Sequence, residues 1–259
     1  MDGEALEVTG WDDEPWPVHV HRGGDAPILW MHGVPTSGED WAPFLRRAGG
    51  VAPDLPGFGR SSKRGDGDFT LDGYARFTGA LVDALGLERV SLVVHDWGGA
   101  ALAWAAAHPE RVEKLVVLNA VPLLPGYRWH RMARLWRTRV IGELAVGATT
   151  GFALRRALPA GVGEVAARGF DQGTQRAILR LYRSAPPERL AAAGRDLGRL
   201  AGVPSLVVWG ARDPYIQTSF AHRYADALGG AEVDVREGAG HWPWIDDPGV
   251  VGTVADFLR

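Results

Sequence analysis

The chain of 259 residues contains no cysteine and only two lysines, and it lacks any long apolar run. Without cysteine, disulfides, thiolate catalysis and cysteine-ligated metals are excluded. No apolar run approaches the roughly 20 residues that a membrane span requires, and the acidic N-terminal segment lacks the apolar centre of a secretory signal peptide. We therefore expect a cytoplasmic protein with no membrane partner.

The chain is rich in hydrophobic residues and has slightly more acidic than basic residues. Hydrophobic residues make up 46% of it, enough for one substantial core, and the formal net charge is −3. This balance argues against nucleic acid as a partner. The charge is unevenly distributed, because the stretch 121–200 contains fourteen arginines and only five acidic residues. That stretch is either an ordinary solvated helical surface or the source of a positive field that draws anionic substrates.

Strand-like and helix-like patterns alternate along most of the chain. This alternation predicts an α/β fold, with a mostly parallel central sheet flanked by helices. Between 121 and 200 there are amphipathic helical pieces without a convincing strand, so we expect a helical cap (121–200) inserted into a core formed by 1–120 and 201–259. The expected strands are 26–32, 90–95, 113–119, 204–210 and 231–237, and the expected core helices are 71–85, 100–108, 219–228 and 250–258.

The segment SLVVHDWGGAALAW places an acidic residue between a buried strand and a helix. A strand, a tight turn and glycines at the start of the helix form the geometry that holds a nucleophile exposed at the edge of a sheet. The turn residue is Asp96, whose carboxylate can attack an electrophilic carbon and form a covalent ester. The backbone N–H of Trp97 can stabilise oxyanion charge. Alternatively, Asp96 is a plain helix cap.

Three further segments supply the remaining parts of a catalytic site. Asp213 follows an expected strand in PSLVVWGARDPYI, and His241 lies in the glycine-containing loop GAGHWPWIDDP. Nucleophile, acid and histidine occur in this chain order in hydrolase triads. His241 would activate the water that cleaves the ester, and Asp213 would orient the imidazole. In LWMHGVPTSGEDW, the backbone N–H of Val34 can point at the same oxyanion as that of Trp97.

These motifs resemble those of the α/β-hydrolase superfamily. The HDWGG segment is similar to the epoxide hydrolase and haloalkane dehalogenase branch, whose nucleophile is an aspartate, and PDLPGFGRSSK and AHPERVEKLVVLNA resemble segments common to that branch. The resemblance covers about 28–119 and 204–259. It implies a hydrolase that acts on a small, mainly apolar molecule and needs no cofactor and no metal.

The two branches differ in the groups that receive the leaving atom. Tyr182 and Arg183 resemble the cap Tyr-Arg pair of epoxide hydrolases, and Tyr127 is the only other tyrosine within 121–200; their hydroxyls would serve an epoxide oxygen. Trp97 and Trp136 resemble the indole donors that hold a halide in dehalogenases. Our main prediction is an epoxide hydrolase, which converts an epoxide to a vicinal diol. The alternative is a haloalkane dehalogenase, which produces an alcohol and a halide, and a further alternative is a non-catalytic ligand-binding protein.

Overall fold

The computed structural model describes residues 3–259; Met1 and Asp2, at the start of the acidic N-terminal segment, lie outside the described residues. One eight-stranded sheet runs in the order β1-β2-β4-β3-β5-β6-β7-β8. The pairs β1–β2 and β2–β4 are antiparallel, and all the others are parallel. The strands are β1 (Gly3–Val8), β2 (Trp16–Arg22), β3 (Ile28–Met31), β4 (Val51–Pro53), β5 (Val90–His95), β6 (Val112–Leu118), β7 (Ser205–Gly210) and β8 (Glu232–Arg236).

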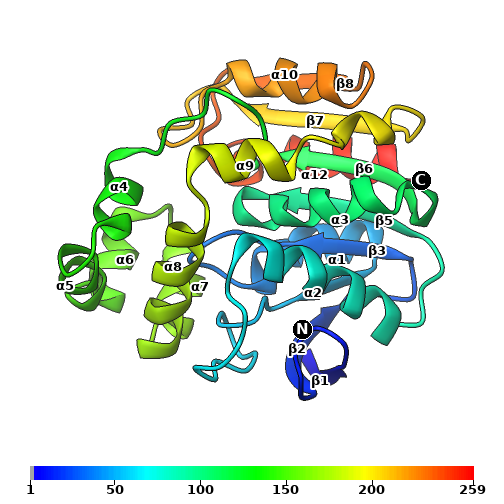
Figure 1. Ribbon diagram of the computed structural model, residues 1–259. Helices are drawn as coiled ribbons and strands as arrows, with labels where there is room; N and C mark the ends of the chain where they lie inside the picture. Colours follow the sequence, from blue (N-terminus) through cyan, green and yellow to red (C-terminus); the bar gives the residue numbers. More distant parts are fainter. Residues whose placement is uncertain (1–2) are drawn as a thin grey trace.

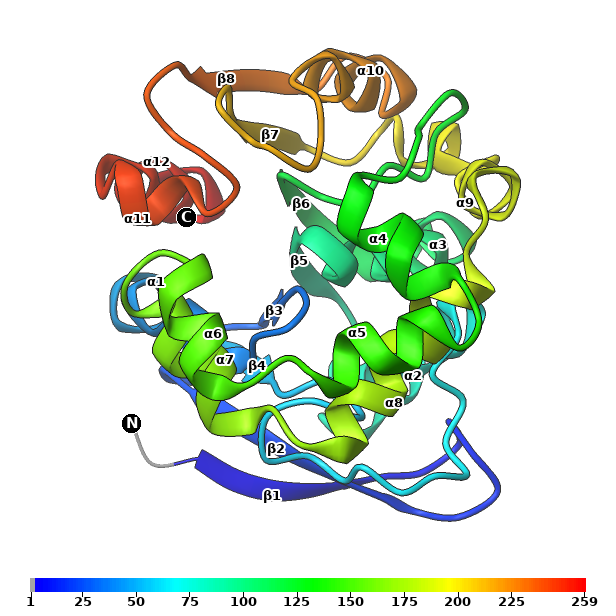
Figure 2. The same ribbon diagram turned by 90° about the vertical axis from the view of Figure 1, so that its left-hand side faces the viewer.

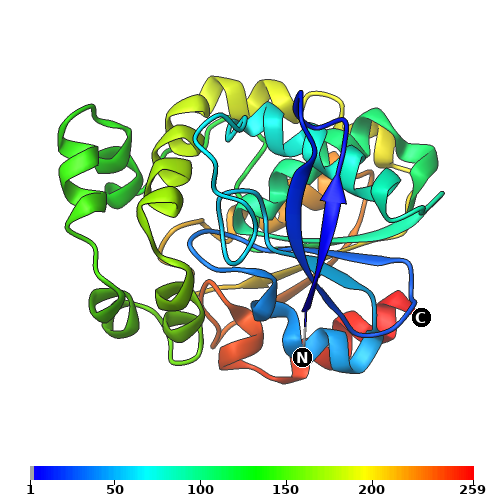
Figure 3. The ribbon, with the colours of Figure 1, turned by 90° about the horizontal axis from the view of Figure 1, so that it is seen from below.

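Helices cover both faces of this sheet (Figure 1). Seen from below, α1 (Ala42–Ala48) and α12 (Gly249–Leu258) lie on one side of the sheet, and α2 (Leu71–Ala84) and α3 (Ala101–Ala107) on the other (Figure 3). The remaining helices of the core are η1 (Gly38–Trp41), η2 (Asp96–Ala100), η3 (Pro109–Arg111), α10 (Ser219–Ala227) and α11 (Pro243–Asp246).

Alternate residues of the buried strands pack into two different apolar cores, because successive side chains of a strand point to opposite faces. In β3, Ile28 and Trp30 pack in the core that contains residues of α1 and α12, whereas Leu29 and Met31 pack with residues of α2 and α3. Burial on both faces explains why the parallel strands appear in the sequence as nearly continuous apolar runs.

Between β6 and β7, the described residues form helices and loops without a strand. Figure 2 looks directly onto α4 to α8, which stand together at one end of the molecule. We keep the division into a core and a helical cap (121–200) as a proposal. The helices of this segment are α4 (Arg131–Arg137), α5 (Ile141–Gly147), α6 (Gly151–Ala157), α7 (Val162–Gly169), α8 (Gln172–Ser184), α9 (Pro187–Ala193) and η4 (Leu197–Leu200).

The predicted fold class is confirmed, and each of the five expected strands occurs within about two residues of its expected bounds. The sequence reading did not predict β1, β2 or β4, which form the antiparallel edge of the sheet and its junction with the parallel strands. Among residues 3–259, no helix is long and apolar enough to cross a bilayer.

Candidate active site

Asp96 lies at the predicted tight turn, directly after β5. Its φ of 47° is in the left-handed region that residues other than glycine rarely adopt. Two glycines make the turn possible: a Cβ at Gly33 would lie 2.4 Å from the Cβ of Asp96, and a Cβ at Gly98 would lie 2.2 Å from the carbonyl oxygen of Met31. Gly98 is therefore needed because of the neighbouring strand β3, and not only for the approach of β5 to its own helix.

Backbone N–H groups hold one side of the Asp96 carboxylate. The N–H of Val34 donates to Oδ2 at 2.9 Å. Burial raises the pKa of Asp96 to about 6, although His241 and the N–H groups of Val34 and Trp97 act to lower it. The N–H groups of Val34 and Trp97 thus both act on the Asp96 carboxylate, with that of Val34 at Oδ2, and Oδ1 lies 3.9 Å from Nε2 of His241.

His241 and Asp213 form a close pair beside this carboxylate. Nδ1 of His241 lies 2.7 Å from Oδ2 of Asp213, and Nε2 lies 3.9 Å from Oδ1 of Asp96. Burial acts to lower the pKa of His241, but the two carboxylates outweigh it and the pKa is raised. Burial also acts to raise the pKa of Asp213, yet His241 and hydrogen bonds hold it below its usual value. The structure therefore brings the three predicted residues together.

Asn119, at the end of β6, completes the surroundings of Asp213. Its Nδ2 donates to Oδ2 of Asp213 at 2.7 Å, and its Oδ1 accepts the N–H of Gly210 at 2.9 Å. The other oxygen of Asp213 accepts the N–H groups of Tyr215 and Ile216. The sequence reading placed Asn119 at the edge of the sheet without giving it a role. It fixes the carboxylate that in turn orients His241.

A cavity of about 280 Å³ opens above Asp96 and His241. Apart from these two residues, its walls are largely apolar and aromatic, which suits a small apolar ligand. The lining residues are Val34, Pro35, Asp96, Val121, Tyr127, Trp129, His130, Met132, Trp136, Thr149, Ala153, Leu154, Ala157, Leu158, Tyr182, Tyr215, Ile216, His241 and Trp242.

Helix α8 delivers Tyr182 to this cavity. The side chain of Asp171 caps the helix by accepting the N–H of Thr174 at 2.9 Å. The buried residues Thr174, Ala177, Ile178, Leu181 and Tyr182 recur at helical spacing and define its inner face. Tyr182 is only 4% exposed, and its inward position follows from this spacing.

Helix α4 is fixed against α8 and carries Trp136. Arg137 donates to the carbonyl oxygens of Tyr182 and Ala185, at the end of α8. The rings of Trp136 and Tyr182 meet edge to face with their centroids 5.0 Å apart. Trp97 packs on the same tyrosine, also at 5.0 Å. Tyr182 therefore sits between the two tryptophans that the sequence analysis singled out.

The aromatic side chains differ in their hydrogen bonding. The indole nitrogens of Trp97 and Trp136 and the hydroxyl of Tyr127 are buried and have no hydrogen-bond partner among the described residues. By contrast, Nε1 of Trp129 donates to the carbonyl oxygen of Ala185 at 3.0 Å. The sequence did not point to Trp129, which lines the cavity and whose ring stacks on that of Trp97 with the centroids 5.4 Å apart. Of the tryptophans that line the cavity, Trp136 and Trp242 thus keep an indole N–H without a partner among the described residues, and the unpartnered indole of Trp97 contacts Tyr182.

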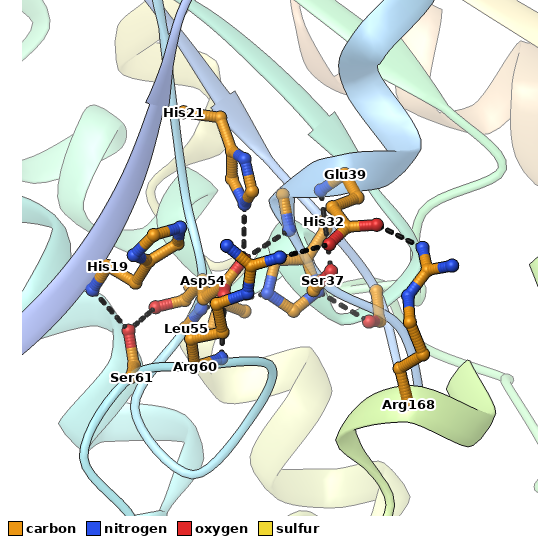
Figure 4. Close-up of polar contacts among 12 residues, drawn as sticks. His19, His21, His32, Ser37, Glu39, Asp54, Leu55, Arg60, Ser61 and Arg168 are labelled. Carbon is orange, nitrogen blue, oxygen red and sulfur yellow. Dashed lines mark hydrogen bonds and ion pairs between the residues drawn. The ribbon is translucent and has the colours of Figure 1, made fainter. Parts of the chain in front are cut away.

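Within residues 3–259, one group of side chains could hold a metal ion, and it lies apart from the cavity. Ligand atoms of His19, His21 and Asp54 are within 4.8 Å of one another. The Asp54 carboxylate already accepts the N–H groups of Gly38 and Arg60 and faces Nε2 of His21 at 3.0 Å (Figure 4). Because these contacts join β2, β4 and η1, we assign the cluster a structural role.

The fold and this geometry define a hydrolase of the α/β-hydrolase family. The family model described as the alpha/beta hydrolase fold matches residues 26–248, so the chain belongs to that family. A haloalkane dehalogenase of Mycobacterium bovis is 33% identical over 243 residues, which cover 82% of this chain and 77% of the relative. A cis-3-alkyl-4-alkyloxetan-2-one decarboxylase of Shewanella oneidensis is 27% identical over 86% of this chain and 79% of its own.

Solved structures resemble the whole chain. The haloalkane dehalogenase DbeA from Bradyrhizobium elkani is 26% identical and covers 99% of this chain and 97% of its own, with a TM-score of 0.82. Dehalogenases thus stand among the relatives in both sequence and structure.

Proposed function

We propose that the protein is a haloalkane dehalogenase, which converts a small haloalkane into an alcohol and a halide ion. The observation that carries this proposal is the buried, unpartnered indole N–H of Trp136 in the wall of the cavity above Asp96, together with the unpartnered indole of Trp97, which packs against Tyr182 of the same wall. A halide accepts hydrogen bonds and needs no proton, so neutral N–H donors suit it. The similarity to haloalkane dehalogenases supports the same choice.

In the first step, Oδ1 of Asp96 attacks the carbon that carries the halogen. A carbon–oxygen bond forms, the carbon–halogen bond breaks, and the halide leaves with the bonding electrons toward the indole donors. Oδ2 then becomes the carbonyl oxygen of the ester, beside the N–H of Val34. The carboxylate is already a nucleophile, so this step needs no base.

In the second step, His241 takes a proton from a water molecule, which attacks Cγ of Asp96. The gap of 3.9 Å between Nε2 and Oδ1 supports this role, since water must reach the ester beside the imidazole. Negative charge develops on Oδ2 and is stabilised by the N–H groups of Val34 and Trp97. The intermediate collapses, and Oδ1 leaves with the alkyl group and takes back the proton from His241 to form the alcohol. Asp213 stabilises the imidazole while it is charged, and the regenerated carboxyl group of Asp96 then releases its remaining proton to water.

Epoxide hydrolysis, the main reading of the sequence, is the second candidate. Its support is that Tyr182 and Tyr127 both line the cavity and that the hydroxyl of Tyr127 is unpartnered. Such a hydroxyl must give a proton to the developing alkoxide. Burial raises the pKa of Tyr182 well above its usual value and also raises that of Tyr127. Both are consequently weaker acids than a free tyrosine, which favours the halide.

A trapping experiment tests the proposal. The His241→Ala variant is incubated with bromoalkanes and with epoxides of matched chain length, and its intact mass is measured. We expect an alkyl adduct from the bromoalkane and stoichiometric bromide release; the adduct from an epoxide would carry one additional oxygen. An adduct formed with epoxides but not with bromoalkanes would support epoxide hydrolysis instead. If neither set of compounds formed an adduct on Asp96, a non-catalytic ligand-binding protein would be the remaining hypothesis.

Single substitutions then test the donors. Trp136→Phe should slow alkylation by bromoalkanes on the order of 10²-fold, as expected for loss of one donor to developing charge. Tyr182→Phe, which keeps the ring, should leave this rate nearly unchanged. The opposite ranking of the two variants would refute the assignment of the indoles.

A further inference from the structure

The charges of the molecule are separated between its two parts. The segment 121–200 carries fourteen arginines and five acidic residues, a net charge of +9, whereas the rest of the chain carries 14 basic and 26 acidic residues, a net charge of −12. Within 128–157 there are seven arginines and a single acidic residue, Glu143, which pairs with Arg183. Positive charge is therefore concentrated on the loops and helices around α4 to α6.

Exposed apolar side chains are concentrated in the same place. Five of the six large hydrophobic residues that are exposed among the described residues lie on α4 to α6 or on the loop between α4 and α5. Four of them are more than half exposed: Val140 (69%), Ile141 (51%), Leu144 (69%) and Phe152 (69%). Helices α4, α5 and α6 form the outer end of the molecule, away from the sheet, at the left of Figure 1, and this end faces the viewer in Figure 2.

Several arginines of this end are also free. Arg131, Arg134, Arg139 and Arg156 are exposed and form no ion pair with any residue of 3–259. An arginine side chain can lay its apolar methylene stem against an apolar surface while its charged guanidinium group stays in contact with water. The end of the molecule thus combines apolar side chains with unpaired positive charge, a combination typical of surfaces that lie in a lipid interface.

The cavity reaches the surface at this same end. Its lining includes Met132 on α4, which is 46% exposed, and the exposed residues Ala153 and Ala157 on α6. Phe152 is adjacent to Ala153 in α6. A ligand dissolved in the outer part of a bilayer could therefore enter the cavity without crossing bulk water.

We propose that the outer face of α4 to α6, named here the cap face, docks on membranes that contain anionic lipids. Charge complementarity identifies the occupant, because unpaired arginines attract anionic headgroups while Leu144 and Phe152 enter the acyl boundary. Docking of this kind needs no spanning helix, so the absence of a predicted span does not bear on it. Membrane binding by this face does not depend on the leaving group of the reaction, so a loss of binding and a loss of turnover can be measured separately.

The experiment is sedimentation of the full chain with vesicles made of equal parts of phosphatidylglycerol and phosphatidylcholine, compared with vesicles of phosphatidylcholine alone. We expect binding to the anionic vesicles that weakens as salt is added. The triple variant Arg131→Gln/Arg134→Gln/Arg139→Gln should bind on the order of 10²-fold more weakly, since each arginine near such a surface contributes about fivefold. Phe152→Ser should weaken binding about tenfold or more.

Matched controls lie outside the cap face. Arg46→Gln/Arg47→Gln on α1 removes two exposed arginines, and Ile245→Ser on α11 removes the sixth exposed apolar side chain; both should bind like the parent. Thermal melts verify that every variant is folded. The proposal is overturned by a lack of binding to anionic vesicles, by equal losses in the controls, or by binding that Phe152→Ser leaves unchanged. It is also overturned if light scattering shows a dimer that Phe152→Ser dissociates, because the occupant would then be a second copy.

Discussion

Replacing Asp96 with asparagine is expected to stop turnover and, at the same time, to stabilise the folded protein at neutral pH. The side chain is only 6% exposed, and burial raises its pKa from an ordinary value near 3.8 to about 6. Folding is therefore less favourable whenever this carboxylate is ionised. Each pH unit of that difference corresponds to about 1.4 kcal/mol. The ionised carboxylate thus lowers the free energy of unfolding by about 2–3 kcal/mol above pH 7.

The sign of the effect follows from the two pKa values. At low pH the carboxyl group is protonated in both the folded and the unfolded states, and it contributes no difference. As the pH rises from about 3.8 to about 6, the unfolded state ionises first, and the folded state loses relative stability until the pH passes the folded pKa. Asparagine is never ionised and keeps an oxygen that can accept the N–H of Val34. Asp96→Asn should nearly match the parent at pH 4 and exceed it at pH 8.

Urea unfolding of parent and variant at pH 4 and pH 8 measures this difference, with intact mass to verify that the amide persists. At pH 8 the gain of about 2–3 kcal/mol should raise Tm by roughly 4–10 °C for a chain of this size. Asp213→Asn is the control with the opposite sign, because the folded pKa of Asp213 is lowered and its charge stabilises the fold at pH 8. An Asp96→Asn protein that is no more stable than the parent at pH 8 would refute the reasoning, and retained turnover would reject Asp96 as the nucleophile.

Three further outcomes follow from the site. The rate of alkylation should fall as the pH drops below about 6, the pKa of Asp96. In His241→Ala this fall should occur at a higher pH, because His241 acts to lower the pKa of Asp96. An unchanged or lower midpoint in the pH–rate profile would contradict this coupling. In a single turnover in ¹⁸O-water, mass spectrometry should find the label in Asp96 and not in the alcohol, because the alcohol leaves with an oxygen of the carboxylate; label in the first alcohol would indicate direct attack by water. Asn119→Ala, which removes a donor to Asp213, should slow ester hydrolysis about tenfold and leave alkylation nearly unchanged, as followed by rapid-quench kinetics; equal slowing of both steps would show a general structural defect.

The sequence was sufficient to predict the parallel half of the sheet and the positions of the three residues at its edge. Apart from the partly exposed edge strand β8, these strands are largely buried on both faces and therefore appear as short, nearly continuous apolar runs. Asp96 directly follows β5 and Asp213 lies in the short loop after β7, so the ends of these strands bring both side chains to the same edge of the sheet. In a parallel sheet these ends meet at one edge, and proximity follows without knowledge of the helices.

The antiparallel strands were missed because their apolar signal is weaker. In β2, Trp16, Val18 and Val20 pack in the core, but Pro17, His19 and the buried His21 alternate with them on the other face, so no continuous apolar run marks the strand. The polar contacts of His21 with Asp54 explain why histidine is tolerated there (Figure 4). β4 has only three residues, too few for a period to be recognised. Such a pairing is specified by side chains distant in sequence, which a local pattern does not reveal.

The sequence identifies candidate side chains in the segment 121–200 but does not determine their roles. The spacing within α8 predicts that Tyr182 lies on an apolar face, yet it does not state what that face meets. Trp129 lies in a loop without any period, in a chain with eleven tryptophans, and only the structure shows that its indole is already bonded while that of Trp136 is free. The choice between a halide and an epoxide depends on this difference.

The residues of the cavity are therefore positioned in two different ways. Asp96 is placed by the end of β5, and His241 by the loop between β8 and α11 at the same edge of the sheet. Trp136 is placed by contacts between short helices, among them the bonds from Arg137 to the end of α8. Because the second kind of contact can change without disturbing the sheet, the nucleophile can stay constant while the groups that receive the leaving atom vary. This is why the sequence predicts the ester chemistry more readily than the substrate.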